Sequence, residues 1–229
     1  IQAHPNVIIW IATAFIRGKF TLPELIEGWS ARCDQIGIRT YYSVCPWSWE
    51  MPRYDPERLH SDLLFWHENK AMGVSAESED NFGSRGPRYW IASRLMYDMD
   101  QSLEGLLEDY YTNCWGAAAP AMRRYWECWE GGRPVTSDRL ALALRDLQEA
   151  DRLAAGDEEV KRRIMMMKAY LHYLRLYREY GAAQGEEKIA ALGRFISYGY
   201  AIQPFHMVHM PNDFYRIVGK PNNRRIDVP

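Results

Sequence analysis

Three short apolar runs alternate with helix-like segments in the first hundred residues, and this alternation limits the possible folds most strongly. The runs cover residues 7–15, 38–44 and 74–76. Continuous runs rich in β-branched and aromatic residues are typical of strands in a parallel sheet, in which both faces are covered. The first part of the chain therefore predicts the order β-α-β-α-β-α, and Trp10, inside the first run, is expected in the core.

Each predicted strand is followed by a segment with helix signals. Thr21 is a predicted N-cap with an acid in the first turn, and the helix is expected to run to about Gln35 and end at Gly37. Asp55, followed by proline, opens the second helix, which is expected to end at Gly73. The third helix is expected over residues 87–111.

Beyond residue 112 the apolar residues recur at helical spacing, and no convincing strand appears. The expected helices cover residues 117–130, 137–155, 158–181 and 186–203. We therefore predict an all-α domain over 116–210 after the β/α units of 1–115, with a tail at 211–229.

Three parallel strands alone leave one flank of a sheet unpaired, which folded proteins avoid. Right-handed β-α-β crossovers close into a barrel when enough units are present. The predicted fold class is thus α/β: about three β/α units from the C-terminal part of a (β/α)8 TIM barrel, followed by an all-α helical domain. The earlier strands, expected upstream in the same polypeptide, are the predicted partner. For a complete chain, the expectation is an open α/β sheet capped by helices.

Composition argues against several other classes. A formal charge of −2 and a pI of about 6.3 do not indicate a nucleic-acid-binding protein. No segment reaches the roughly 18 apolar residues of a membrane span. The cysteines are Cys33, Cys45, Cys114 and Cys128, without metal-binding spacing, so we expect no metal and no cofactor. Cys114 and Cys128 are expected as buried free thiols, with a disulfide between them as the alternative.

Several motifs resemble one family. They are Gly73-Val-Ser-Ala-Glu-Ser78, the stretch from Tyr89 to Asp100, and the stretch from Leu107 to Tyr125. Together they resemble domain of unknown function 4838 (DUF4838) over roughly residues 5–130. In the last motif Cys-Trp-Gly-Ala stands where the family has Tyr-Gly-x-Ala. The resemblance implies a TIM barrel related to α-glucuronidases and hexosaminidases, with helices after the barrel. By the same analogy the protein is expected to be secreted or periplasmic.

Three carboxylates are the candidate catalytic residues. Glu77 ends the third predicted strand and corresponds to the acidic position of the family pattern. Glu79 shares its face only if the chain stays extended, and Glu50 follows the loop after the second strand. Glycoside hydrolysis commonly uses two such carboxyl groups, one on each side of the scissile bond. Each of the three also has an ordinary interpretation, as a solvated loop acid or a partner of a helix N-terminus.

The predicted substrate-binding residues lie near these acids in the sequence. Trp47 and Trp49 lie in the loop after the second strand, where either a sugar or the helical domain is expected to cover them. Tyr41 and Tyr42 alternate faces, so one of the two is expected to face a ligand, and we predict that Tyr42 does so. Asn81 and Arg88, which follow the third strand, complete the predicted set.

His206 and His209 carry a weaker hypothesis. Two histidines three residues apart bind a metal if a third ligand such as Asp213 arrives. The preferred interpretation is a loop or helix end that packs against the rest of the protein.

Two functions remain open. The first is a glycoside hydrolase-like barrel that acts on a poly- or oligosaccharide through carboxylate acid/base chemistry. The usual proton donor of such barrels lies on an earlier strand, so this chain alone is expected to be inactive. The alternative is a non-catalytic carbohydrate-binding or scaffolding protein with a degenerate barrel site.

Overall fold

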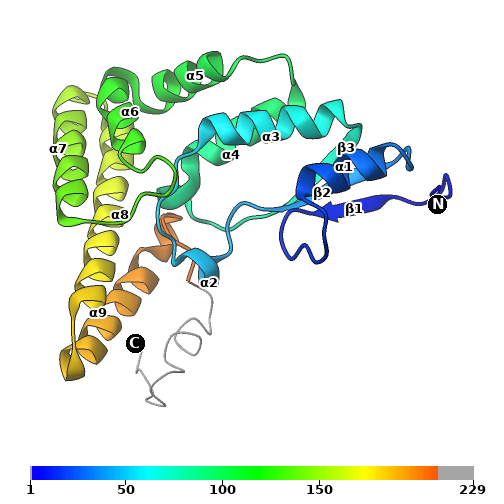
Figure 1. Cartoon of the computed structure of the whole chain (residues 1–229). Helices are drawn as coiled ribbons and strands as arrows, with labels where there is room; N and C mark the ends of the chain where they lie inside the picture. Colours follow the sequence, from blue (N-terminus) through cyan, green and yellow to red (C-terminus); the bar gives the residue numbers. More distant parts are fainter. Residues whose placement is uncertain (1, 211–229) are drawn as a thin grey trace. The chain divides into compact units, whose positions relative to one another are not determined.

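The structure is a computed structural model that describes residues 2–210 (Figure 1). The predicted tail and Asp213 lie outside the described residues. The chain is α/β, with a small parallel sheet and a larger helical part. By their internal contacts the described residues divide into two units: unit 1 comprises residues 2–44, 55–78 and 87–107, and unit 2 comprises residues 45–54, 79–86 and 108–210. The predicted site residues are therefore divided between the units: Glu77 belongs to unit 1, whereas Glu50 and Glu79 belong to unit 2.

The sheet of unit 1 consists of three parallel strands in the order β1-β2-β3. They are β1 (Ile9–Ala12), β2 (Ile36–Tyr41) and β3 (Ala71–Glu77). The predicted alternation of strands and helices is therefore confirmed. The register pairs Trp10 with Gly37 and Tyr41 with Glu77, so the C-terminal ends of the strands share one edge of the sheet.

The two faces of this sheet differ in burial. Ile11, Ile36 and Ile38 lie on one face and are almost completely buried, and helices α1 (Leu22–Ser30) and α3 (Pro56–Glu68) pack on the strands. The opposite face, called the open face below, includes Trp10, Gly37, Arg39, Tyr41, Ser75 and Glu77 by the alternation of strand side chains.

Trp10 is 50% exposed, so the prediction that it lies in the core is wrong for the described residues. Its ring covers Gly37, where an added Cβ would lie 2.7 Å from the ring. A continuous apolar run predicts burial on both faces, but here only one face of β1 is buried.

Several predicted element ends are wrong by a few residues. Helix α1 begins with the predicted cap, in which the Thr21 hydroxyl accepts from the backbone N–H of Glu24, but it ends at Ser30. Gly37 and Gly73 lie inside strands instead of ending helices. β3 starts at Ala71, directly after the turn that follows α3.

The single helix expected over 87–111 is two helices, α4 (Phe82–Tyr97) and α5 (Leu103–Trp115). The break follows Tyr97, and the carboxylate of Asp98 accepts a hydrogen bond from the backbone N–H of Asp100. Local bonding of this kind gives Asp an alternative to the helix, which explains the break.

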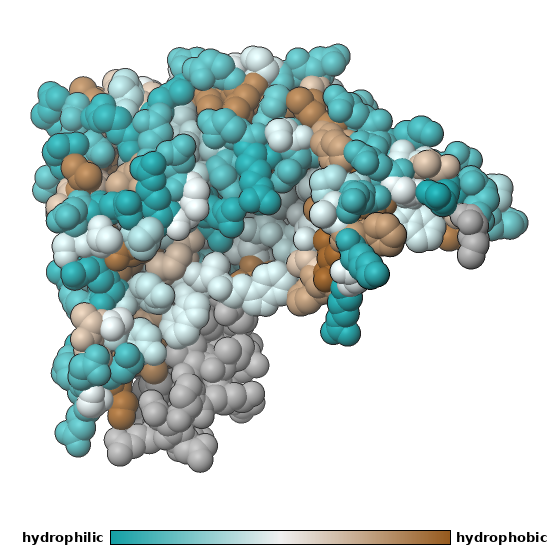
Figure 2. Space-filling view, in the orientation of Figure 1, coloured by the Kyte–Doolittle hydropathy of each residue, from teal (hydrophilic) through white to brown (hydrophobic). Residues whose placement is uncertain are grey.

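Unit 2 is mostly helical. The helices that follow α5 in this unit are α6 (Ala119–Glu127), α7 (Ser137–Leu153), α8 (Glu158–Ala182) and α9 (Gly185–Ile202). Short 3-10 turns lie at Gly116–Ala118 and Gln203–Phe205. The short helix α2 (Cys45–Ser48) belongs to the same unit. All four predicted C-terminal helices are confirmed. The side of α7 seen in Figure 2 is mainly hydrophilic, as expected for a helix that buries one face.

Within residues 2–210 no helix is long and apolar enough to cross a membrane. Cys33, Cys114 and Cys128 are free thiols in the structure. Cys33 is buried, whereas Cys114 and Cys128, which were expected to be buried, are partly exposed.

Two helical glycines offer a matched test of packing in unit 2. A Cβ at Gly83 would lie 2.6 Å from the carbonyl oxygen of Met207 and 2.6 Å from the ring of Tyr170. We expect Gly83→Ala to lower the free energy of unfolding of unit 2 by about 1–3 kcal/mol, because the backbone carbonyl cannot easily move aside.

Gly193 in α9 is the control, since nothing lies within 4 Å of its added Cβ. Gly193→Ala is expected to stabilise the helix by about 0.5–1 kcal/mol. Denaturant unfolding followed by circular dichroism measures both variants. Equal effects of the two substitutions would contradict the close packing at Gly83.

Candidate functional site

Glu77 occupies the C-terminal end of β3, on the open face of unit 1. Its Oε2 atom lies 2.6 Å from Nη2 of Arg39, and Nη1 of Arg39 donates to Oγ of Ser75 at 3.0 Å. The side chains of Arg39 and Glu77 are 37% and 40% exposed. The register of β2 and β3 explains these contacts, because Arg39 is paired with Ser75 and Tyr41 with Glu77. The open face thus presents a charged pair that solvent reaches.

Aromatic side chains continue this group. The guanidinium of Arg39 lies 5.4 Å from the ring centroid of Tyr41, within the range of a cation–π contact. The ring of Phe15 meets the Tyr41 ring edge-on at 5.7 Å. Phe15 belongs to the segment between β1 and α1, so the strand ends and the loop that follows β1 together build the site.

Tyr42 and Arg88, both predicted to bind substrate, contact each other. Tyr42 is 5% exposed, and the guanidinium of Arg88 lies 5.1 Å from its ring centroid. Arg88 also forms an ion pair of 2.8 Å with Asp55. Burial raises the pKa of Tyr42 to about 12. Of the two neighbouring tyrosines, Tyr41 is the one on the open face.

Glu50 is enclosed in unit 2, with a side chain that solvent does not reach. Its Oε2 atom accepts from Nδ2 of Asn81 at 2.5 Å and from Oγ of Ser84 at 3.0 Å. Its Oε1 atom has no hydrogen-bond partner among the described residues. Burial raises the pKa of this carboxyl, although the Asn81 bond and the nearby Arg85 and other groups oppose the shift. Glu50 is therefore harder to ionise than a carboxyl group in water.

The backbone around Glu50 is strained. Trp49 and Glu50 have φ values of 52° and 57°, in the left-handed region that non-glycine residues rarely adopt. Two tyrosines of α8 hold these peptides, since the hydroxyl of Tyr170 donates to the carbonyl of Glu50 at 2.7 Å and that of Tyr173 to the carbonyl of Trp49 at 3.0 Å. The helical bundle thus fixes the conformation of this loop.

The two tryptophans of the same loop have different surroundings. The ring of Trp49 stacks on Tyr180 and Phe195, with centroids 6.0 and 6.1 Å away. The sequence left open whether a sugar or the helical domain covers these rings. For Trp49 the cover is provided by helices α8 and α9. Trp47 is 55% exposed.

Glu79 and the first residues of α4 lie beside residues 206–209. Oε2 of Glu79 is 3.2 Å from Nε2 of His209, and Oδ2 of Asp80 is 3.5 Å from Nδ1 of His206. The carbonyls of residues 206 and 207 accept from the first N–H groups of α4, at Phe82 and Gly83. Strand pairing ends at Glu77, so the alternation of side chains along a strand does not determine where the Glu79 side chain points.

Among the residues that the structure describes, no group of three His, Cys, Asp or Glu side chains could hold a metal ion. The metal hypothesis for His206 and His209 also needs Asp213, which lies outside that part of the chain.

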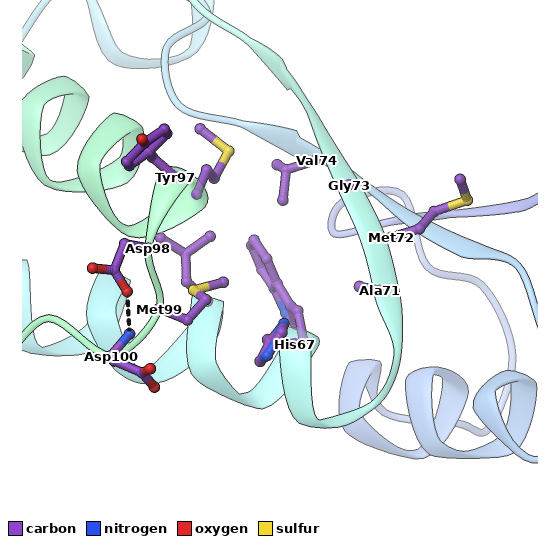
Figure 3. Close-up of a pocket in the computed structure, with 12 residues that line it drawn as sticks. His67, Ala71, Met72, Gly73, Val74, Tyr97, Asp98, Met99 and Asp100 are labelled. Atoms are coloured by element: carbon purple, nitrogen blue, oxygen red, sulfur yellow. Dashed lines mark hydrogen bonds between the residues drawn. The ribbon is translucent and has the colours of Figure 1, made fainter.

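A cavity of about 410 Å³ opens at the other end of β3 in unit 1 (Figure 3). It is lined by Leu63, Trp66, His67, residues 71–74 and residues 96–100. In Figure 3 the side chain of Met72 points away from the labelled acids Asp98 and Asp100. The predicted site residues do not line this cavity, because it borders the beginning of β3 and Glu77 ends the strand.

The predicted residues thus form separate groups. Glu77 lies in the pair with Arg39, Tyr42 contacts Arg88, and Glu50 contacts Asn81. Sequence reasoning missed Arg39 and Phe15, and it considered His209 only as a metal ligand and not as the partner of Glu79. Arg39 was within reach, because it lies two residues before Tyr41 and so shares its strand face. No sequence signal pairs His209 with Glu79.

The sequence over residues 1–127 matches the family described as domain of unknown function (DUF4838). The match covers more than half of the chain. The chain belongs to the DUF4838 family. No curated protein and no solved structure matches it.

The DUF4838 match includes the whole sheet and ends with α6 at Glu127. Arg39, Glu50 and Glu77 lie inside the matched region, whereas Tyr170 and His209, which contact the candidate residues of unit 2, lie outside it. The region matched by the family therefore includes Glu50 and Glu77. Tyr170, which contacts Glu50, comes from a helix beyond that region.

The buried carboxyl of Glu50 predicts how the stability of unit 2 depends on pH. Its pKa in the folded state is higher than the ordinary value of 4.5. The stability that it contributes is present below 4.5 and is lost as the pH rises through the folded-state pKa, because burial opposes ionisation. Glu50→Gln keeps the acceptor for Asn81 and Ser84 and cannot ionise.

We expect Glu50→Gln to match the wild type near pH 4 and to become more stable above it, by up to about 1.4 kcal/mol per pH unit until the folded-state pKa is reached. Unfolding in denaturant at several pH values measures the difference. A constant difference across pH 4–8 would mean that folding leaves the pKa of Glu50 unchanged, and would contradict the prediction. Glu79→Gln is the comparison, since Glu79 is partly exposed.

Proposed function

We propose that this protein is carbohydrate-active and forms part of a glycoside hydrolase-like barrel that acts on a poly- or oligosaccharide. The observation that carries the proposal is the position of Glu77: a solvent-accessible carboxylate at the C-terminal end of a parallel strand, paired with Arg39 on the open face. Enzymes built on parallel β/α barrels hold their catalytic groups at this end of the strands. Membership of the DUF4838 family assigns no activity.

The barrel itself is part of the proposal, with the described sheet as its last three strands. The N–H groups of Ile9 and Thr13 donate to residues of β2 or the segment before it. The backbone groups of Trp10 and Ala12 consequently face away from β2, because successive residues of a strand alternate in direction. A strand from an earlier part of the polypeptide would pair along this edge and give the open face an interior position. An exported location belongs to the same proposal and rests on analogy with other polysaccharide-degrading barrels.

In this mechanism Glu77 acts as the carboxylate, either the base or the nucleophile, because it is already paired with a guanidinium. The proton donor comes from a carboxylic acid on another strand of the full-length protein. The distance between the two carboxyl groups would decide the configuration of the product at the anomeric carbon. A distance of about 5–5.5 Å is typical of enzymes that retain the configuration, and about 6.5–9.5 Å of enzymes that invert it. Glu50 is less suited to contact with a substrate, since its side chain is completely enclosed.

Glu77→Gln in the full-length protein tests the enzymatic role. We expect turnover of aryl glycosides to fall by about 100- to 10,000-fold, because the amide can act neither as base nor as nucleophile. Steady-state kinetics on a series of aryl glycosides measures the change. Glu68→Gln, which removes the same charge from an exposed position on α3, is the control and is expected to leave turnover unchanged. Unchanged turnover in Glu77→Gln would remove Glu77 from the mechanism.

The second candidate is a non-catalytic carbohydrate-binding or scaffolding protein. Trp49 favours it, since protein rings already cover the aromatic face that a sugar would occupy. Binding of oligosaccharides by the full-length protein, without hydrolysis of any of them, would select this candidate over the enzyme.

A further inference from the structure

The loop between β1 and α1 exposes two phenylalanines. Phe15 is 70% exposed and Phe20 is 63% exposed, and hydrophobic side chains gather over this part of the surface in Figure 2. The two differ in their contacts. Phe15 meets Tyr41 edge-on at 5.7 Å, whereas Phe20 has no ring contact within the described part of the chain.

Phe15 is also held in an unfavourable backbone conformation. Its φ is 63°, and a bulky side chain in the left-handed region costs free energy that glycine would avoid. Strained residues of this kind are often found at binding sites, where the surrounding structure keeps them in place. Here the contact with Tyr41 holds the ring at the C-terminal edge of the sheet.

A continuous set of contacts joins this ring to Glu77. Phe15 touches Tyr41, the guanidinium of Arg39 lies over Tyr41, and Arg39 is paired with Glu77 and bonded to Ser75. An exposed apolar ring therefore stands beside a group of hydrogen-bonding side chains on the same edge.

We propose that Phe15 forms the aromatic wall of a saccharide subsite next to Glu77. The apolar C–H face of a pyranose would lie on the Phe15 ring, and its hydroxyls would bond to Arg39, Ser75 and Glu77. A purely apolar ligand fits less well, because it would desolvate these polar groups without pairing them. The inference rests on the proposed carbohydrate-active function and deepens it by naming a binding residue.

The experiment measures the affinity of the full-length protein for cellotetraose, xylotetraose and chitotetraose by calorimetry. Phe15→Ala is expected to weaken the binding of the saccharide that the wild type prefers by roughly 2- to 10-fold, the range for loss of an aromatic contact. Phe15→Tyr and Phe15→Trp keep a ring and are expected to keep the affinity. Phe20→Ala removes a similarly exposed ring from the same loop and is expected to leave it unchanged.

Phe15→Gly separates binding from folding. It removes the ring and relieves the backbone strain, so the thermal midpoint of unfolding is expected to stay the same or rise while the affinity falls. Wild-type affinity in Phe15→Ala and Phe15→Gly would overturn the subsite and leave the proposed function standing. An equal loss in Phe15→Ala and Phe20→Ala would also overturn it. If the wild type binds none of the three saccharides, the proposed function and the subsite fail together.

Discussion

The parallel pairing of β2 with β3 determines the chemistry of unit 1. Its register sets Arg39 beside Ser75 and Tyr41 beside Glu77, so the ion pair and the aromatic contacts follow from backbone geometry. Pairing shifted by one residue would turn these side chains toward the buried face. The irregularity in the register near Ile36 and Ile38 lies below the charged pair and leaves it intact. Strands hold the side chains of a site more precisely than loops do. The positions of Arg39, Ser75 and Glu77 therefore depend little on the surrounding loops.

Much of the secondary structure could be predicted from sequence periodicity. The three strands and the four C-terminal helices have strong patterns, and their existence is confirmed. The ends of helices and strands are harder to predict from sequence. Gly37 and Gly73 both resemble the glycines that terminate helices, but they lie in strands β2 and β3. Trp10 shows a second limit: an apolar run does not reveal whether one face or both faces of a strand are covered within the chain.

The candidate site was less predictable than the fold. Glu77 has a strong local signal, since it ends an apolar strand before a glycine-rich loop. The surroundings of Glu50 depend on Tyr170 and Tyr173 of α8, which no local pattern connects to the loop. The same holds for Glu79, whose partner His209 lies far along the chain. Sequence reasoning finds acids at strand ends, but it cannot assign partners that come from distant helices.

The strained loop at Trp49 and Glu50 has a consequence for biosynthesis. The two tyrosines that hold its carbonyls follow it by 120 and 124 residues. A ribosome that has completed the sheet has therefore not yet made the residues that secure this loop. Pairing over such distances is slow, and multi-part proteins form the N-terminal part first. The sheet is thus expected to assemble early in translation, and the segment around Glu50 to reach its final shape only after α8 has left the exit tunnel.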